Sequence, residues 1–339
     1  MATFNFDTLL EKKNKIEGTL AGKKVYCYST NNTGKTYQLT RISPKTFLIA
    51  TEAGDSCCVC PKVSCTSWSN FKEIVSDLTK PQNVEKRREQ IDIVVIDTIE
   101  NLVELSELAT CNQFGVRDLS EIAGKSNGYK IARTDFKQQV NKLCLAGYCV
   151  CFIGHDSVVD YTDPLTQETV QFTIPKGTDN EKSSLRMIRD LADFTIYLKP
   201  NPVDPETFKV VPSTAICVRT KTVFARARFD IQPIINPFTA EGLKKAIEEA
   251  IQKSAEKENI GIVDFDTDAH KVYTKEDYLE IIKPYIDRLY GLCPEEVLDI
   301  CSSEFGDRKV SEATDDDLVA LDNVYNKLVT KATLLNIDI

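Results

Sequence analysis

The stretch Lys24-Val25-Tyr26-Cys27-Tyr28-Ser29-Thr30-Asn31-Asn32-Thr33-Gly34-Lys35-Thr36 decides the fold of this chain. It is a short apolar run, followed by a small polar turn and then by Gly-Lys-Thr. This order is typical of a phosphate-binding loop, in which a buried strand fixes the start of the loop and the loop's backbone N–H groups wrap a polyphosphate. The helix that follows points its positive N-terminus at the same anion. The stretch therefore predicts a nucleotide-binding site between a strand and a helix.

The residues of this loop have separate roles in the predicted site. Lys35 is expected to contact the β- and γ-phosphates as a point charge, and the Thr36 hydroxyl is expected to bind Mg²⁺. The usual pattern G-x-x-x-x-G-K-[ST] has a glycine where this chain has Ser29, which fits if the backbone keeps a negative φ there. The alternative is an ordinary strand-to-helix turn. The residues expected to hold the nucleotide are Ser29, Thr30, Asn31, Asn32, Thr33, Gly34, Lys35, Thr36 and Tyr37.

The length of 339 residues exceeds that of one typical domain, which predicts one large domain plus a smaller one, and the composition is that of a globular protein. Apolar residues make up 42% and charged residues 27%, and no apolar run approaches the ~18 residues that a membrane span needs. The first 22 residues are polar and charged, without the apolar core of a signal peptide. We therefore expect an intracellular protein with no membrane partner.

Twelve cysteines raise the question of disulfides or bound metal. Most lie inside apolar, strand-like runs, as Cys149 and Cys151 do, where a reduced thiol is a small apolar side chain. The exception is the run Cys57-Cys58-Val59-Cys60, followed by Cys65. Four thiols so close together could bind zinc, but paired C-x-x-C spacing is absent and no histidine is near. A zinc site there stays an open alternative.

The net charge of −9 is unevenly distributed along the chain. From Ile231 to Ile339 there are 12 Lys and Arg against 23 Asp and Glu, a net charge of −11, so the first 230 residues carry +2. The acidity belongs to the C-terminal third. It does not exclude a nucleic-acid partner for the front part, because such binding depends on local basic patches.

Strand-like and helix-like segments alternate along the first 230 residues. The near-continuous aliphatic run at 91–98 is what a strand buried on both faces of a parallel sheet requires. The alternation predicts an α/β fold, a layered domain with a mostly parallel central sheet. The predicted strands are 24–28, 47–52, 91–98, 148–154, 194–198, 215–218 and 223–229; the predicted helices are 34–43, 71–78 and 134–145, with a hairpin inside a long excursion at 157–190.

The pattern changes near Pro233 and Pro237. From Ala240 onward apolar residues recur at helical spacing, and the loop at 261–272 is a candidate linker. We therefore predict two parts. They are a nucleotide-binding domain at 1–235 and an acidic, mainly helical region at 236–339, within which 295–328 is expected to form a small helical module.

Three further candidates end predicted strands, where the ligands of open α/β sheets gather. Asp97 is placed to reach the shell of the Mg²⁺ ion, and Glu52 to orient and deprotonate an attacking water. His155 could sense the γ-phosphate and pass its presence into the next loop. Each has a plainer alternative: an acid at a strand end, a solvated glutamate before a turn, or a structural histidine.

Basic residues form two more candidate sites. Arg219 and Lys221 lie on a β-like segment and could reach the nucleotide of a neighbouring subunit as fingers; a solvated charged face is the alternative. The excursion at 157–190 carries cations that could neutralise nucleic-acid phosphates or could instead pair with nearby acids. These cations are Lys176, Lys182, Arg186 and Arg189, and the next candidates are Lys125, Lys130 and Arg133.

Several motifs together resemble those of the RecA-like ATPases of bacteriophages, in particular the phage nucleotide-binding proteins associated with single-strand annealing and recombination. The resemblance covers roughly residues 20–230 and rests on the order and spacing of the motifs more than on any one of them. The motifs are STNNTGKT at 29–36, FLIATEAGD at 47–55, IDIVVIDTIENL at 91–102, YCVCFIGHD at 148–156, LADFTIYL at 191–198 and VRTKTVFARARFD at 218–230.

The resemblance implies a RecA-like P-loop core that uses ATP and Mg²⁺, with Lys35 and Thr36 as the loop pair and Asp97 as the acid on the metal side. It implies a general base, a polar sensor and paired basic fingers that act across a subunit interface. The loop after His155 would bind DNA. The catalytic residues, in these roles, would be Glu52, Lys35, His155, Arg219 and Lys221.

The function that follows is that of an ATPase acting on single-stranded DNA, assembled as a homo-oligomeric ring or filament. Its place would be the cytoplasm, that of the host cell if a phage encodes it. Two alternatives stay open. One is a phosphoryl-transferring kinase, for which the 157–190 excursion offers only Arg186 and Arg189 as lid arginines. The other is a nucleotide-gated DNA-binding or assembly protein without significant hydrolysis.

Overall fold

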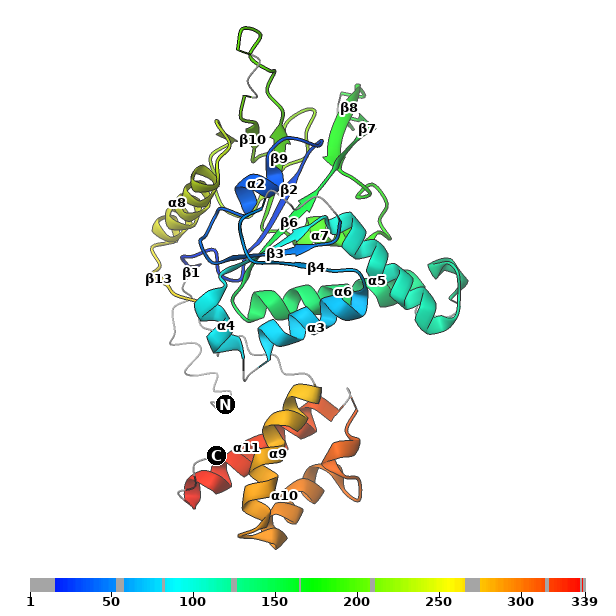
Figure 1. The fold of residues 1–339 in the computed structure, drawn as a ribbon, viewed down its shortest axis with the longest axis vertical. Helices are drawn as coiled ribbons and strands as arrows, with labels where there is room; N and C mark the ends of the chain where they lie inside the picture. The colour runs from blue at the N-terminus through cyan, green and yellow to red at the C-terminus, as the bar shows by residue number, and fades with distance from the viewer. Residues whose placement is uncertain are drawn as a thin grey trace. The chain divides into compact units, whose positions relative to one another are not determined.

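The computed structural model describes residues 16–52, 58–80, 83–122, 127–164, 166–207, 211–265, 275–314, 317–335 and 337. These residues form two compact units, one at 16–265 and one at 275–337, and each is described by itself (Figure 1). None of the helices in these residues has the length and apolar character that a membrane crossing requires.

The larger unit is built on a nine-stranded sheet with the order β12-β10-β9-β2-β6-β5-β3-β4, to which β11 adds by pairing with β9. The strands from β9 to β4 are parallel to their neighbours, while β10, β11 and β12 are antiparallel additions at one side. The predicted α/β fold with a mostly parallel sheet is confirmed. The strands are β2 (Lys24–Tyr28), β3 (Thr46–Ala50), β4 (Lys62–Ser64), β5 (Ile93–Asp97), β6 (Cys149–Gly154), β9 (Phe194–Lys199), β10 (Thr214–Ile216), β11 (Arg226–Ala227) and β12 (Ile234–Ile235).

Two smaller pairings lie outside this sheet. Strands β7 (Asp156–Thr162) and β8 (Thr169–Pro175) form an antiparallel hairpin, so the hairpin predicted within 157–190 is present. Strands β1 (Ile16–Glu17) and β13 (Ile262–Val263) pair in parallel. The predicted linker at 261–272 contains β13, which is part of the larger unit, and its residues from 266 onward lie outside the described residues.

Helices cover both faces of the sheet, as the strand sequences require (Figure 1). In β2, Val25 and Cys27 face one apolar core and Tyr26 and Tyr28 face the other, because successive side chains of a strand point to opposite faces. Helices α2 and α8 pack on the first face, and α3, α5, α6 and α7 pack on the second. The helices are α2 (Lys35–Leu39), α3 (Trp68–Thr79), α4 (Val84–Gln90), α5 (Ile99–Phe114), α6 (Gly128–Leu145), α7 (Ser184–Leu191) and α8 (Ala240–Glu258), with a short 3₁₀ helix at Leu119–Glu121.

Helix α8 moves the boundary that the sequence predicted between residues 235 and 236. Leu243, Ile247 and Ile251 lie on one face of α8, four residues apart, and are buried in the same core as β2 and β9. The nucleotide-binding unit therefore continues through α8. The change of composition near Pro237 marks the start of a helix in the same unit rather than a second domain.

Helix α2 is shorter than the predicted 34–43. It ends at Leu39, and the Thr40 hydroxyl donates to the Thr36 carbonyl (2.7 Å). Pro44 follows shortly after, and a proline disfavours helical backbone in the residue before it, here Ser43. The helix that follows the phosphate loop is thus little more than one turn long.

In the described residues of the smaller unit, three α-helices and a short 3₁₀ helix share an apolar core. Tyr278, Ile282 and Leu289 of α9 pack with Leu321 and Leu328 of α11, each set spaced to share a helix face. The predicted helical character of this region is confirmed, and the module begins earlier than the predicted 295–328. Its elements are α9 (Lys275–Tyr290), α10 (Pro294–Phe305), a 3₁₀ helix (Val310–Glu312) and α11 (Leu318–Leu334).

Candidate nucleotide-binding site

The carboxyl ends of four parallel strands meet at one edge of the sheet. The register pairs Tyr28 at the end of β2 with Gly154 at the end of β6, and Asp97 at the end of β5 with Ala50 at the end of β3. Strand β6 lies between β2 and β5. His155, the next residue after β6, is therefore placed between the phosphate loop and the strand that carries Asp97.

An open cavity of about 450 Å³ lies at this edge, within the size range of small-molecule sites. Residues 31–37 of the loop line it together with Glu52, Asp97, Thr98 and His155. The predicted loop, metal-side acid, base and sensor are thus brought together around one cavity.

The backbone of the loop explains how serine replaces the usual first glycine. Ser29 is fully buried, and its backbone does not have a positive φ. A serine therefore fits at this position without the conformational freedom of glycine. Gly34 has φ +83°, a left-handed conformation that a side chain would strain, and Asn32 has φ +61°. The loop therefore keeps glycine at the position where the backbone requires it.

Lys35 is bound inside its own loop. Its Nζ donates to the carbonyl oxygens of Ser29 (2.9 Å) and Thr30 (2.7 Å) and to Ser29 Oγ (3.0 Å). Burial lowers the pKa of Lys35, and the negative charge of Asp97 opposes that shift. A polyphosphate over the loop would offer this ammonium charged acceptors, which form stronger hydrogen bonds than neutral carbonyls do.

Thr36 and Asp97 are joined directly, although 61 residues separate them in the sequence. The Thr36 hydroxyl donates to Asp97 Oδ2 at 2.6 Å. Burial raises the pKa of Asp97, and the hydrogen bond from Thr36 opposes this. A hydroxyl and a carboxylate side by side at the cavity are hard oxygen donors of the kind that Mg²⁺ prefers, so this pair fits the predicted metal site.

Glu52 is held by a residue that the sequence did not single out. Asn101, in the first turns of α5, donates from Nδ2 to Glu52 Oε2 (3.3 Å). Among the described residues, the amide binds only Oε2 and leaves the other carboxylate oxygen, Oε1, for a water in the cavity. The signal in the sequence was the position of Asn101 four residues after Asp97, at the start of a helix that follows a site strand.

Thr51, one residue before Glu52, ties the ends of β3 and β5 together. Its hydroxyl accepts from the Thr98 N–H (2.9 Å) and donates to the Thr98 carbonyl (2.9 Å). One side chain thus binds both backbone groups of a buried residue at the cavity wall; the Thr98 carbonyl also accepts the Leu102 N–H (3.3 Å). Thr51 keeps Glu52 and Asp97 in register.

Replacing Thr51 with valine is expected to destabilise the nucleotide-binding unit by about 1–3 kcal/mol, because an isosteric apolar side chain leaves the buried Thr98 N–H without its acceptor. Trp68 is the single tryptophan of the chain and is buried in this unit, so its fluorescence follows urea unfolding of this unit. Thr51→Ser keeps the hydroxyl and serves as the control. A valine variant with the wild-type urea midpoint and slope would exclude this role of the threonine.

His155 contacts the loop and a helix at once. Its Nε2 lies 2.9 Å from Asn31 Oδ1, across 124 residues of sequence, and its backbone N–H donates to the carboxylate of Glu100 in α5. Glu100 was not among the residues that the sequence predicted for this site.

Tyr37, one of the residues predicted to bind the nucleotide, lines one side of the cavity. Its ring is 52% exposed, and the Arg41 guanidinium lies 3.6 Å from the ring centroid. The ring thus adds an apolar surface to a cavity otherwise rich in polar groups.

Arg219 and Lys221 do not line the cavity of their own chain. The guanidinium of Arg219 lies over the rings of Tyr161 and Phe172, at 5.2 and 4.9 Å from their centroids, and so packs against the β7–β8 hairpin. Both basic residues are exposed. Their action on the nucleotide of a neighbouring subunit stays a prediction.

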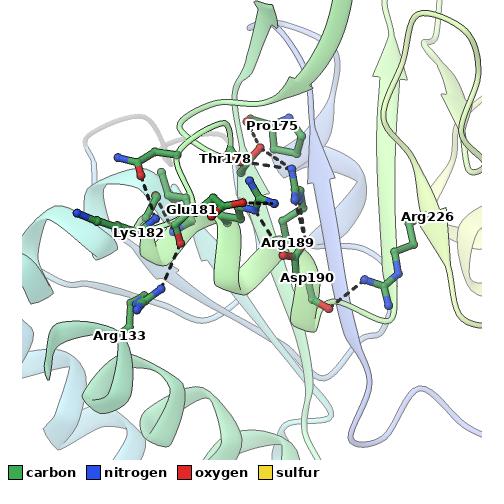
Figure 2. A network of polar contacts seen from close by, with 12 residues as sticks. Arg133, Pro175, Thr178, Glu181, Lys182, Arg189, Asp190 and Arg226 are labelled. Atoms are coloured by element: carbon green, nitrogen blue, oxygen red, sulfur yellow. Dashed lines mark hydrogen bonds and ion pairs between the residues drawn. The ribbon is translucent and has the colours of Figure 1, made fainter. Parts of the chain in front are cut away.

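The arginines predicted to bind DNA are engaged in contacts within the chain. Figure 2 shows Arg189 directed at Thr178 and Asp190, with 3.3 Å to both Thr178 oxygens and 2.9 Å to the Asp190 carboxylate. Arg186 pairs with Glu181 (3.6 Å) and Asp190 (3.8 Å). The alternative that these cations pair with nearby acids therefore holds for both arginines.

The lysines of the same segment, unlike its arginines, are not held by ion pairs among the described residues. The side chains of Lys176 and Lys182 are exposed, and neither is ion-paired in the part of the chain that the structure describes. Among the next candidates, Arg133 donates to the Glu181 carbonyl (3.2 Å; Figure 2), Lys130 is exposed, and Lys125 lies outside the described residues. The exposed cations of this face are thus mainly lysines.

The cysteine cluster is described only in part, because Cys57 lies outside the described residues. Within the described ranges no group of three or more His, Cys, Asp or Glu is arranged to hold a metal ion. Cys58 and Cys65 are buried, and Cys60 is half-buried.

Two comparisons with known proteins show what this chain is similar to. The family model described as "AAA domain" matches residues 21–229, which contain the loop, the site strands and the hairpin. The chain is also 31% identical over 248 residues to the SPbeta prophage-derived uncharacterized protein YorG of Bacillus subtilis (strain 168). That similarity covers 73% of this chain and 72% of the relative.

Proposed function

This chain belongs to the AAA domain family, and from that premise we propose that it is a Mg²⁺-dependent ATPase that acts on single-stranded DNA in phage-type recombination or annealing. One observation carries the proposal. The Thr36–Asp97 hydrogen bond joins the phosphate loop to the strand of the metal-side acid at a cavity that Lys35 and Glu52 also line.

Binding begins with the loop between Ser29 and Lys35. Its backbone N–H groups and the ammonium of Lys35 face an anion placed over the loop, and Lys35 exchanges its contacts with loop carbonyls for contacts with phosphate oxygens. Thr36 and Asp97 would hold the Mg²⁺ ion, which would supply positive charge to the phosphate oxygens.

Hydrolysis needs a water placed and deprotonated beside the terminal phosphate. Glu52 lines the cavity, and Asn101 fixes one of its carboxylate oxygens, so the other can accept the proton of an attacking water. Lys35 stabilises the negative charge that develops on the phosphoryl oxygens. The rate then depends on how well Glu52 is oriented.

The proposed role of the oligomer depends on Arg219 and Lys221. They are exposed, and they do not line the cavity of their own chain. We propose that they approach the nucleotide of a neighbouring copy in a ring or filament and add positive charge there. The hairpin on which Arg219 packs follows directly after His155, so a change at the cavity has a short path to this residue.

ATPase assays with and without single-stranded DNA test the proposal. Turnover that rises with single-stranded DNA supports it. Turnover only in the presence of a small phosphoryl acceptor would identify a kinase instead. Nucleotide binding without turnover would identify a nucleotide-gated DNA-binding or assembly protein.

The DNA part of the proposal predicts a salt effect at the exposed lysines. Each neutralised phosphate of a single strand contributes a slope of about −0.7 in log affinity against log salt. Changing Lys176 and Lys182 together to alanine is expected to flatten that slope by about one to one and a half units, while the variant still binds ATP. Fluorescence anisotropy of a labelled oligonucleotide, titrated at several salt concentrations, measures the slope.

The matched control removes two other exposed lysines, Lys45 and Lys253, and is expected to keep the wild-type slope. If the Lys176/Lys182 double variant also keeps it, single-stranded DNA does not bind at this segment. The face that carries Lys130 is then the next to test.

A further inference from the structure

A buried carboxylate lies directly behind the nucleotide cavity. Glu100 stands in the first turn of α5 and is only 7% exposed. Its Oε1 accepts the backbone N–H of His155 at 2.6 Å and lies 3.7 Å from Nδ1 of the same histidine. Burial raises the pKa of Glu100, and the hydrogen bond from His155 opposes this.

Gly154 makes this approach possible. A Cβ at Gly154 would stand 2.6 Å from the Tyr26 hydroxyl oxygen and 3.0 Å from Glu100 Oε1, so a side chain there would clash with Tyr26 and crowd the carboxylate. The Tyr26 hydroxyl and Glu100 Oε2 are both buried and have no hydrogen-bond partner among the described atoms. Burying polar groups in this way costs stability, which a role at the site would explain.

The carboxylate belongs to a chain of contacts that ends at the phosphate loop. Glu100 holds the backbone and faces the ring of His155, and the far ring nitrogen of His155 meets Asn31 in the loop. Asn31 and His155 line the cavity, whereas Glu100 does not. Glu100 can therefore influence a bound nucleotide through His155.

We propose that Glu100 is a positioning residue that orients the His155 ring toward the terminal phosphate of the bound nucleotide. One ring nitrogen faces Glu100, so the other is directed at the cavity, where a phosphate oxygen can replace Asn31 Oδ1 as its partner. The inference rests on the proposed ATP site and adds to it a means of telling a triphosphate from a diphosphate.

Other charged groups surround this contact and bear on its test. Asp97 of β5 and Lys176 after β8 act on the same pair electrostatically, and Lys35 of the loop feels the charge of Glu100. These groups stay unchanged in the variants below. A difference between variants therefore reports on Glu100 itself.

The test compares Glu100→Gln with the wild type by calorimetry of ATP and ADP. Glutamine keeps an oxygen for the His155 N–H and removes the charge that faces the ring. ATP affinity is expected to fall roughly tenfold, the effect of one weakened charge-assisted hydrogen bond, while ADP affinity changes less than about twofold. Equal affinities of variant and wild type for both nucleotides, or an equal loss for both, would overturn the proposal.

The control is Glu107→Gln, two turns further along the same helix. Burial also raises the pKa of Glu107, yet its side chain does not line the cavity. This variant is expected to bind both nucleotides as the wild type does. A loss of ATP affinity in Glu100→Gln but not in Glu107→Gln is then due to the lost contact with His155, and not to the loss of any half-buried carboxylate in α5.

A double-variant cycle tests whether Glu100 acts through His155. If it does, Glu100→Gln combined with His155→Ala binds ATP no more weakly than His155→Ala alone. Independent, additive losses would refute the route through the ring. If Lys35→Ala also binds ATP normally, the proposed site itself is wrong; if Lys35→Ala loses binding and Glu100→Gln does not, only the positioning role fails.

Nuclear magnetic resonance supplies a readout that does not depend on affinity. The chain has two histidines, so in a His270→Gln background His155 is the only source of imidazole signals. Glu100→Gln is expected to shift the ring ¹⁵N signals of His155 in the absence of nucleotide, because the charge facing Nδ1 is gone. Ring signals that match with and without the carboxylate would contradict the proposal even if binding changed.

Discussion

Replacing Lys35 with alanine is expected to reduce ATP affinity by roughly 100-fold or more, to the point where calorimetry detects no binding. Lys35 is the loop cation that we propose faces the phosphates, and its Nζ also closes the loop through three hydrogen bonds to Ser29 and Thr30. Alanine removes the charge and leaves these oxygens without their donor. The variant therefore loses both the contact with phosphate and the shape of the loop.

The control for Lys35→Ala is Lys45→Ala, which removes an exposed lysine just before β3, at the other end of the strand from the cavity. It is expected to bind ATP as the wild type does. Thermal unfolding of both variants, followed by Trp68 fluorescence, shows whether the unit is still folded. A folded Lys35→Ala variant with unchanged ATP affinity would refute the phosphate-loop assignment.

Replacing Glu52 with glutamine is expected to lower kcat by about 10²–10⁴-fold and to leave ATP affinity within about twofold of the wild-type value. The amide has nearly the shape of the carboxylate and still offers an oxygen to Asn101, so the cavity is preserved. It does not accept a proton from water at neutral pH. Single-turnover hydrolysis and equilibrium binding, measured on the same preparation, separate these two effects.

Glu85→Gln, an exposed change on α4, is the matched control and is expected to hydrolyse ATP at the native rate. A native rate in Glu52→Gln as well would mean that the base lies elsewhere. Asp55, three residues further along and outside the described residues, would then be the next carboxylate to replace.

The sequence alone predicted the phosphate loop and the two acidic candidates, Glu52 and Asp97. The loop motif is local, since the strand, the turn at Gly34 and the cation at Lys35 lie within a dozen residues. Asp97 and Glu52 were predictable because each ends an apolar run, and strands of a parallel sheet present their carboxyl ends at one edge. Periodicity and apolar runs act over short distances, so they are readable without the fold.

Contacts between distant segments were decided by the tertiary structure. The strand order places β6 between β2 and β5, which brings His155 to Asn31 and to Glu100, across 124 and 55 residues of sequence. Composition marks neither Glu100 nor Thr51, because a buried glutamate in a helix and a threonine after a strand have no local signature. Their roles depend on which backbone groups the packed neighbours present to them.

The same distinction explains the corrected boundary and the paired arginines. Helix α8 joins the first unit because Gln38 Oε1 accepts the N–H of Ala240, 202 residues away, and because its apolar face fills the core over β2 and β9. Arg186 and Arg189 form ion pairs with acidic residues of their own segment, which the folding of α7 brings within reach. The sequence by itself determined which chemical groups the protein has and the local elements that carry them. Which groups meet was decided only by long-range packing, because burial and pairing depend on neighbours that local sequence does not specify.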